Sequence, residues 1–417
     1  MKITPLVQWI KEKTQGQPIA EWQLARLNDT LELAENSPFY RKRLPDGPLT
    51  DLSQIAQLPL MSQQDILEQD NRLLCVHPGQ IERIVSLTTS GSTNRCKRIY
   101  FTVEDQELTV DFFHRGMYTL VEPGQTMAVM MPCERVGGVG DLICRGISRI
   151  PVEPVPHGLV TNFAAALDML VKSKAQTLVG IPLQILSLAR YSEIRQVKPF
   201  VRKALVSAEY VPDVMVRELQ RIWDCEVYQH YGMTETGLGA AIDCQEHMGY
   251  HMREADLLFE IIDPLTGLVL PDGQYGEVVF TTLTRKGMPL LRYRTGDISA
   301  ILPGPCACGG GRRLALIKGR WQEGIALPSG QVRMPDLDEA LLALPQIMDF
   351  ALEINAADKK EMRLKIVTFG QLPALIPDEV RAALASRRIV LPNLEIEICP
   401  AAEFVTLHRA KRLIKYV

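Results

Sequence analysis

The sequence lacks several features that mark whole classes of protein. No apolar run approaches the roughly 20 residues that span a membrane, and the N-terminus has no signal-peptide core. Internal repeats and low-complexity tracts are also missing. With 46 basic and 49 acidic side chains, the formal charge of -3 gives no electrostatic argument for binding nucleic acid or an anionic membrane. We therefore expect a cytoplasmic protein with neither a nucleic-acid nor a membrane partner.

Cysteine is present, but its pattern excludes a disulfide framework. The nine cysteines are odd in number and have no close, regular spacing. Most of them are expected to be small buried hydrophobic residues. Cys306 and Cys308 form the one close pair.

The 417 residues suit one large and one small domain. Between about residues 80 and 300, short apolar runs alternate with amphipathic stretches, which favours βα units around a largely parallel sheet. The expected strands are Met127–Met131, Thr177–Ile181, Lys203–Val206 and Glu226–Tyr228, and Asp213–Trp223 is an expected helix. Leu257–Asp263 and Gly276–Thr282 are expected to form a hairpin or two sheet strands. Near the N-terminus, the spacing of Leu24, Leu27, Leu31 and Ala34 predicts a helix that ends before Ser37.

The pattern changes after the glycine-rich segment Pro303–Gly311. Expected helices (Asp336–Leu344, Asp378–Ser386) alternate with expected strands (Phe350–Ile354, Leu364–Phe369, Leu394–Ile398). The predicted fold is α/β, with a large N-terminal domain (1–319) of mostly parallel sheets and helices, followed by a small mobile α+β domain (320–417). The cleft between two such domains is the expected place for a ligand.

Three segments carry residues suited to nucleotide chemistry. The first is a loop of small hydroxylated residues around a glycine, followed by a lysine: Thr88, Thr89, Ser90, Gly91, Ser92, Thr93 and Lys97. Backbone N–H groups and hydroxyls in such a loop can converge on phosphate oxygens, although the Walker A spacing is absent. The alternative is an ordinary polar turn after a strand.

The second segment runs from a predicted strand into Tyr231, Gly232, Met233, Thr234 and Glu235. Open α/β sheets bind ligands at this edge, and Glu235 is suited to holding Mg²⁺. Its alternative is a water-exposed carboxylate. The third segment is Leu291–Asp297. Its Asp297 is suited to ribose hydroxyls, or alternatively to an ion pair with Arg292 or Arg294.

Together, the three segments in this order, followed by a small domain, resemble the adenylate-forming (acyl-CoA synthetase) superfamily. The chain is most similar to its phenylacetate–CoA ligase branch, which also contains coenzyme F390 synthetase-like proteins. Further matching segments are Leu31–Leu44, Leu58–Leu60, Glu260–Gly267 and Gly276–Val278.

The resemblance implies roles for single residues. The Thr88–Thr93 loop with Lys97 would hold the ATP phosphates, and Thr234 and Glu235 would serve phosphate and Mg²⁺. The other implied nucleotide-binding residues are Tyr231, Gly232, Met233, Ser207, Ala208, Glu209, Asp297 and Arg320. The implied reaction is attack of a carboxylate on the α-phosphorus of ATP, with transfer of the acyl group to CoA after rotation of the small domain.

The chain departs from the family at two places. Asn94 and Cys96 stand where the family usually has Gly and Pro. At the C-terminus the alignment puts Arg409 at the position of the catalytic lysine, with Lys411 two residues later, and these two side chains differ in reach and geometry. The alternative is that this tail is only a basic terminal strand.

Some members of the branch also carry a cysteine and histidine arrangement like that of Cys244, His251, Cys306 and Cys308, which implies a structural zinc. His247 is the alternative histidine, and a metal-free reduced pair is the alternative to zinc. The expected substrate is a small, apolar or aromatic carboxylic acid. A non-CoA acceptor, or a degenerate protein that only binds nucleotide, remains the alternative function. A homodimer is plausible from the branch.

Overall fold

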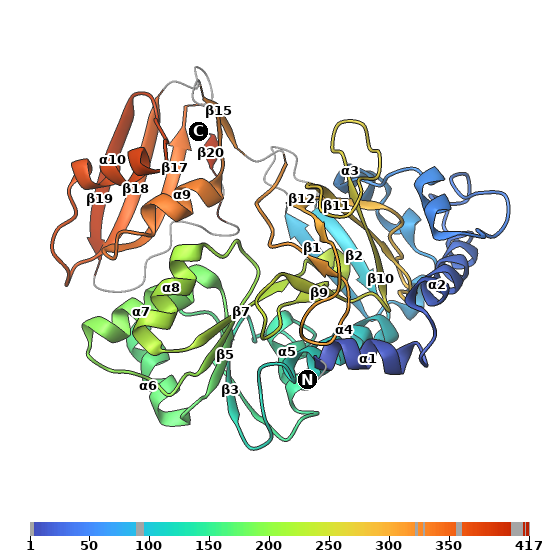
Figure 1. Cartoon of the computed structure of the whole chain (residues 1–417), viewed down its shortest axis with the longest axis horizontal. Helices are drawn as coiled ribbons and strands as arrows, with labels where there is room; N and C mark the ends of the chain where they lie inside the picture. The colour runs from blue at the N-terminus through green and yellow to red at the C-terminus, as the bar shows by residue number, and fades with distance from the viewer. Residues whose placement is uncertain are drawn as a thin grey trace. The chain divides into compact units, whose positions relative to one another are not determined.

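The computed structural model describes residues 4–88, 96–321, 324–327, 330–355, 361–401, 412 and 414–416, with only the backbone of Thr88 (Figure 1). The chain divides into two compact units, each assembled from separate segments. Unit 1 comprises Met1–Glu122, Arg135–Pro151 and His230–Ile317. Unit 2 comprises Pro123–Glu134, Val152–Gln229 and Lys318–Val417.

Unit 1 combines N-terminal helices with antiparallel sheets. Its helices are α1 (Pro5–Lys13), α2 (Ile19–Ala34), α3 (Gln63–Gln69), α4 (Val103–Met117), α5 (Val139–Ile147) and the short 3-10 turns η1 (Leu52–Gln57), η2 (Asp70–Leu73), η3 (Pro78–Gln80) and η4 (Thr234–Thr236). Strands β1 (Arg83–Thr88) and β2 (Cys96–Phe101) form a hairpin. A second sheet has the order β10 (Leu257–Ile262), β11 (Gly276–Thr282), β12 (Tyr293–Ser299). The short strands β8 (Ala241–Ile242), β9 (Tyr250–Met252), β13 (Ile301–Leu302) and β14 (Arg313–Leu314) complete the unit.

Unit 2 contains the parallel sheet that the sequence predicts. Its order is β7-β6-β5-β3-β4, and every neighbouring pair is parallel. The elements are β3 (Thr126–Met130), β4 (Glu153–Pro156), α6 (Phe163–Ser173), β5 (Thr177–Gly180), α7 (Pro182–Ile194), β6 (Lys203–Val206), α8 (Asp213–Trp223) and β7 (Glu226–Tyr231). Residues Thr177–Gly180 are all buried, as expected for a parallel strand covered on both faces.

The C-terminal part of unit 2 is built around a four-stranded sheet with the order β19-β18-β17-β20. Its elements are β15 (Ile325–Leu327), β16 (Gly330–Val332), α9 (Met334–Leu341), β17 (Ile347–Ile354), β18 (Met362–Phe369), α10 (Pro377–Ser386), β19 (Leu394–Ala401) and β20 (Lys415–Tyr416). This part shares one hydrophobic core with the parallel-sheet layer. For example, the Phe163 and Phe369 rings lie 6.0 Å apart.

The predicted α/β fold class is confirmed. The helix that ends before Ser37 is α2, and Asp213–Trp223 is α8 residue for residue. The boundary between the units falls inside β7, which pairs with β6 through its first residues and antiparallel with β8 through its last. The division into domains 1–319 and 320–417 and the mobility of the second stay predictions. Among the described residues, no helix is both long enough and apolar enough to span a bilayer.

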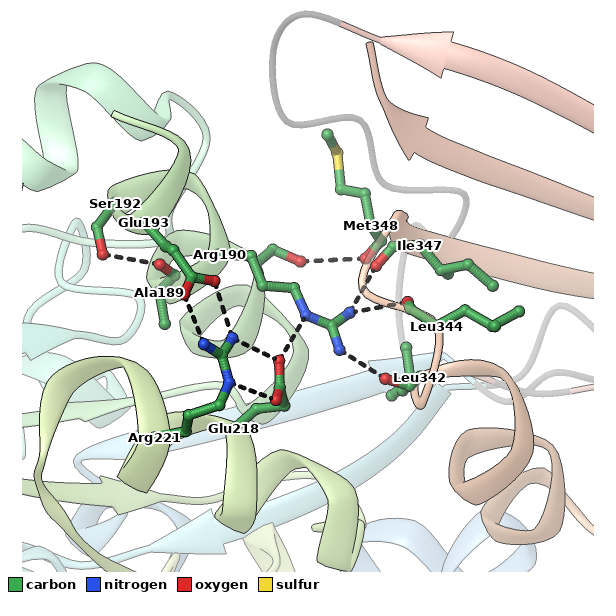
Figure 2. A network of polar contacts seen from close by, with 11 residues as sticks. Ala189, Arg190, Ser192, Glu193, Glu218, Arg221, Leu342, Leu344, Ile347 and Met348 are labelled. Atoms are coloured by element: carbon green, nitrogen blue, oxygen red, sulfur yellow. Dashed lines mark hydrogen bonds and ion pairs between the residues drawn. The ribbon is translucent and has the colours of Figure 1, made fainter. Parts of the chain in front are cut away.

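Within unit 2, Arg190 on α7 joins the parallel-sheet layer to the C-terminal part (Figure 2). Its side chain donates hydrogen bonds to the carbonyl oxygens of Leu342 at 2.6 Å, Ile347 at 2.9 Å and Leu344 at 3.4 Å. Arg190 is only 2% exposed, and burial lowers its pKa to about 10, so it stays charged at neutral pH. The guanidinium thus donates to backbone carbonyls around the end of α9, of which that of Leu344 also accepts the Ile347 N–H at 3.1 Å.

We predict that Arg190→Met lowers the free energy of unfolding by about 3 kcal/mol, because it removes a buried charge-assisted network. Urea denaturation followed by circular dichroism measures the loss. The matched control is Arg221→Met on α8, whose side chain is 50% exposed although it pairs with Glu193 and Glu218. Screening by water should limit that loss to about 1 kcal/mol or less. A loss of about 1 kcal/mol or less in Arg190→Met would contradict a strong contribution of the buried network.

Candidate active site

The Thr/Ser/Gly loop connects the two strands of the β1–β2 hairpin. The strands are antiparallel, and Thr88 pairs with Cys96 at the end next to the loop. Thr89, Ser90, Gly91, Ser92 and Thr93 lie outside the described residues, as do the side chain of Thr88 and the C-terminal candidates Arg409 and Lys411. Of this predicted phosphate-binding group, the structure therefore places the backbone of Thr88 and all of Lys97.

Glu235 forms a buried ion pair with Lys97. The Lys97 Nζ contacts Glu235 Oε1, and the hydroxyl of Tyr293 donates to the same oxygen at 3.0 Å. Only 4% of Glu235 and 8% of Lys97 are exposed. Burial raises the pKa of Glu235, but the Lys97 charge and the hydrogen bonds outweigh it and hold that pKa below the ordinary value. The alternative of a water-exposed carboxylate is therefore wrong.

The second contact joins Tyr231 to Asp297. The Tyr231 hydroxyl donates to Asp297 Oδ2 at 2.8 Å, and both residues are buried. Arg292 pairs instead with Glu260 at 2.9 Å, and Arg294 pairs with Glu277 at 2.5 Å. The ion pair considered for Asp297 is therefore not formed with either arginine. The Asp297 carboxylate instead contacts Tyr231, the last residue of β7.

The backbone around Glu235 adopts a conformation that depends on glycine. A Cβ at Gly232 would lie 2.3 Å from the carbonyl oxygen of Leu238. Gly237 and Leu238 both have positive φ, 73° and 66°. Met233 and Thr236 close the turn, because the Met233 N–H donates to the Thr236 hydroxyl, which donates back to the Met233 carbonyl. Thr234 accepts from the Gly237 N–H, so the whole segment is a tight, internally bonded turn.

The remaining nucleotide-binding candidates belong to unit 2. Ser207 follows β6, and its N–H donates to the Gly180 carbonyl at 3.1 Å. Ala208 has φ +80°, which is uncommon for a residue with a side chain and typical of functional turns. Glu209 is half-buried, and its charge acts on buried Arg412. Arg320 is half-buried beside the start of the C-terminal part.

The four predicted zinc ligands form one buried cluster in unit 1. The ligand atoms of Cys244, His251, Cys306 and Cys308 all lie within 4.8 Å of one another. Cys308 Sγ is 3.1 Å from His251 Nε2, and Cys244 Sγ is 3.8 Å from Cys306 Sγ. The alternative histidine, His247, lies outside this cluster and contacts Asp243 through Nδ1 at 2.7 Å.

Pairing of short strands explains how residues distant in sequence assemble this cluster. Strand β9, which carries His251, pairs with β8 just before Cys244 and with β14 just after Cys308. Tetrahedral zinc with sulfur ligands at about 2.3 Å requires sulfur–sulfur separations of about 3.8 Å. The Cys244–Cys306 separation matches this value.

Comparison with known proteins places this geometry in a family. The AMP-binding enzyme family matches residues 57–283, more than half of the chain. The chain belongs to the AMP-binding enzyme family. The resemblance to adenylate-forming enzymes of the phenylacetate–CoA ligase-like branch is thereby confirmed.

Curated relatives support the same branch. Phenylacetate-coenzyme A ligase of Pseudomonas putida is 28% identical over 347 residues, covering 79% of this chain and 77% of its own. Phenylacetate-coenzyme A ligase of Aromatoleum evansii is 26% identical over 433 residues, covering 97% of this chain and 96% of its own. In fold, the chain is similar to 2-hydroxyisobutyryl-CoA ligase in the postadenylation state, with a TM-score of 0.78 at 19% identity over 94% of this chain and 87% of that one.

Sequence reasoning missed the partners of Glu235. Tyr293 lay within the third segment, but no role was assigned to it. A signal was available, because Tyr293, Thr295 and Asp297 alternate along β12 and therefore share one buried face. The Lys97–Glu235 contact had no such signal, because it joins two separate segments.

We predict that Lys97→Met lowers the free energy of unfolding by about 3 kcal/mol at pH 7, since it leaves a buried carboxylate without a counter-ion. In the wild type the pKa of Glu235 is lower in the folded state than in the unfolded state, where it is about 4.3. Ionised Glu235 therefore stabilises the fold above the unfolded-state pKa. This stabilisation is lost as the pH falls through the folded-state pKa. In the variant, burial raises the Glu235 pKa, so the carboxyl destabilises the fold as the pH rises.

The difference between the two proteins should therefore be largest at neutral pH and shrink below about pH 4.5. Urea denaturation from pH 4 to 8 measures it. Lys172→Met is the control, because this lysine is 80% exposed and pairs, among the described residues, only with exposed Asp168. A Lys97→Met effect that stays constant over this range would contradict the buried pair.

Proposed function

We propose that this protein is an AMP-forming carboxylate–CoA ligase that activates a small carboxylic acid. The observation that carries the proposal is the buried carboxylate of Glu235, held ionised by Lys97 at the position of the family's metal-binding glutamate. The names of the curated relatives suggest an arylacetic acid such as phenylacetate as the first substrate to test.

In the first half-reaction, a carboxylate oxygen of the acid attacks the α-phosphorus of ATP. The bond to the bridging oxygen breaks and pyrophosphate leaves, giving an acyl-adenylate. Bound Mg²⁺ would neutralise phosphate charge, with Glu235 as its protein ligand. Lys97 and the loop from Thr88 to Thr93 would hold phosphate oxygens, and Thr234 would support them from the neighbouring turn.

Other residues would bind the nucleoside. Asp297 offers carboxylate oxygens to the ribose hydroxyls, and its present hydrogen bond from Tyr231 orients it for this role. From the family resemblance we assign nucleotide binding to Tyr231, Gly232 and Met233 in unit 1, with Tyr231 near adenine. We assign it likewise to Ser207, Ala208, Glu209 and Arg320 in unit 2. In the second half-reaction the CoA sulfur attacks the acyl carbonyl carbon, AMP leaves, and the thiol proton passes to solvent or a base.

The alternative functions depend mainly on what the C-terminal tail does. Arg409 or Lys411 would supply positive charge to the acid carboxylate and the α-phosphate, in place of the lysine usual in the family. If neither does, the protein is a nucleotide-binding regulator. A third possibility is an adenylating ligase whose acceptor is not CoA. A homodimer and a cytoplasmic location stay predictions.

We predict acid-dependent release of pyrophosphate from Mg-ATP, tested against aryl and short-chain acids with and without CoA. Glu235→Gln should lower the rate about 100-fold, because it removes a charged ligand of the metal. The matched control is Glu260→Gln, which alters a buried glutamate that pairs with Arg292. This control should affect stability more than rate.

Release that CoA stimulates supports the ligase, whereas release without stimulation indicates another acceptor. Absence of release across the whole panel, in protein that still binds ATP, would leave only the nucleotide-binding alternative. If Glu260→Gln slows release as strongly as Glu235→Gln, the effect is not specific to the metal-binding position.

We also propose that Cys244, His251, Cys306 and Cys308 hold a structural zinc ion. Three thiolates and one imidazole form a closed tetrahedral donor set, and all four residues are at most 5% exposed. Such a set leaves no open position for a substrate, so the ion would tie β8, β9 and the loop before β14 together rather than take part in the reaction.

We predict about one zinc per chain in purified protein, measured by plasma mass spectrometry. Cys306→Ser should lower both the zinc content and the melting temperature, because it removes one ligand from a closed site. Cys399→Ser is the control, since Cys399 is an exposed free cysteine. Zinc well below one per chain, together with an unchanged melting temperature in Cys306→Ser, would rule out the site.

A further inference from the structure

The turn Ser207–Glu209, between β6 and α8 in unit 2, has an unusual backbone. It directly follows the last residue of β6, and the Ser207 N–H donates to the Gly180 carbonyl at 3.1 Å. Ala208 is exposed and has φ +80°, in the left-handed region. This conformation is unfavourable for a residue with a Cβ, so contacts on either side must hold the turn in it.

One such contact fixes the start of α8, just after the turn. The helix begins at Asp213, and its N-cap position is occupied by Pro212, whose ring carries no acceptor for the free N–H groups of the first turn. The Asp213 N–H instead donates to Oε1 of Glu339, on α9, at 2.5 Å. A carboxylate at this end also interacts favourably with the helix dipole. Glu339 thus supplies the cap that the N-cap residue of α8 cannot provide.

The Glu339 side chain is held in place for this role. It is 11% exposed, and its Oε2 atom accepts from Arg387 Nη2 at 3.3 Å. The hydroxyl of Tyr210, which directly follows Glu209, donates to Glu339 Oε1 at 3.5 Å. One carboxylate of the C-terminal part therefore contacts the chain at Tyr210 and at Asp213, both within unit 2.

A second charge of the C-terminal part acts on the turn itself. Arg412 donates to Asp338, the neighbour of Glu339 on α9, at 2.6 Å, and its Nε atom lies 3.6 Å from Asp349 Oδ1. The carboxylate of Glu209 also attracts Arg412 electrostatically. The C-terminal part thus acts on this segment through a carboxylate and through a guanidinium, independently of each other.

We propose that Glu339 is a positioning residue for the nucleotide site: by capping α8 it holds the turn Ser207–Glu209 in the conformation that receives ATP. The assignment rests on the proposed function, which gives Ser207, Ala208 and Glu209 a role in nucleotide binding. Glu339 acts through the turn and not through contact with ATP. It raises the fraction of molecules whose turn can bind, and the apparent affinity rises with that fraction.

The test measures the dissociation constant of Mg-ATP by calorimetry on the full chain. Glu339→Ala removes the acceptor, so the turn can relax from its left-handed conformation, and the affinity should become about tenfold weaker. Glu339→Gln keeps an acceptor oxygen and should keep most of the affinity.

The matched control is Glu379→Ala. Glu379 also accepts a backbone N–H at the start of a helix in the C-terminal part, that of Ile376 before α10, at 2.9 Å. Both substitutions remove a cap and should lower the melting temperature slightly. Only Glu339→Ala should weaken the binding of Mg-ATP.

Addition of Ala208→Gly to Glu339→Ala separates positioning from a general loss of stability. Glycine adopts the left-handed conformation without the steric penalty of a Cβ. The double variant should therefore recover much of the Mg-ATP affinity while its melting temperature stays below that of the wild type.

Unchanged Mg-ATP affinity in Glu339→Ala, or equal weakening in Glu379→Ala, would overturn the proposal. A double variant that binds no better than Glu339→Ala would overturn it as well, as would a wild type that does not bind Mg-ATP. Pyrophosphate release, measured separately, decides the proposed function. A wild type that binds Mg-ATP without releasing pyrophosphate would contradict the ligase and leave the positioning role of Glu339 to be decided by the affinities.

Discussion

The geometry of the site depends on one buried ion pair, that of Lys97 with Glu235. An ionised carboxylate that is 4% exposed persists only if nearby groups compensate it, and here Lys97 and Tyr293 do so. Because these three side chains come from β2, η4 and β12, the pair holds three separate segments of the chain together. The hairpin that carries the Thr/Ser/Gly loop is thereby fixed against the turn after β7. Strand β12 is fixed in the same way, and it places Asp297 beside Tyr231.

Local signals in the sequence predicted much of the fold. Helix α8 and strand β6 match their predicted bounds because hydrophobic periodicity and turn residues determine them within a short window. The four predicted zinc ligands could be grouped because members of the resembling branch carry a similar arrangement, and they do form one cluster. The contacts of Glu235, Asp297 and Arg285 could not be predicted in this way. They depend on which distant segments pack together, and Asp297 had two arginines nearby in sequence that pair elsewhere.

Three buried arginines show how differently the fold treats the same side chain. Arg190 satisfies backbone carbonyls around the end of α9, and Arg253 satisfies Asp256 and the Leu108 carbonyl. These contacts offset part of the hydration that each guanidinium loses on burial, so both contribute to stability without a ligand. Among the described residues, Arg285 stacks on the Phe101 ring at 5.0 Å, and the carboxylates of Asp105 and Glu235 act on it electrostatically.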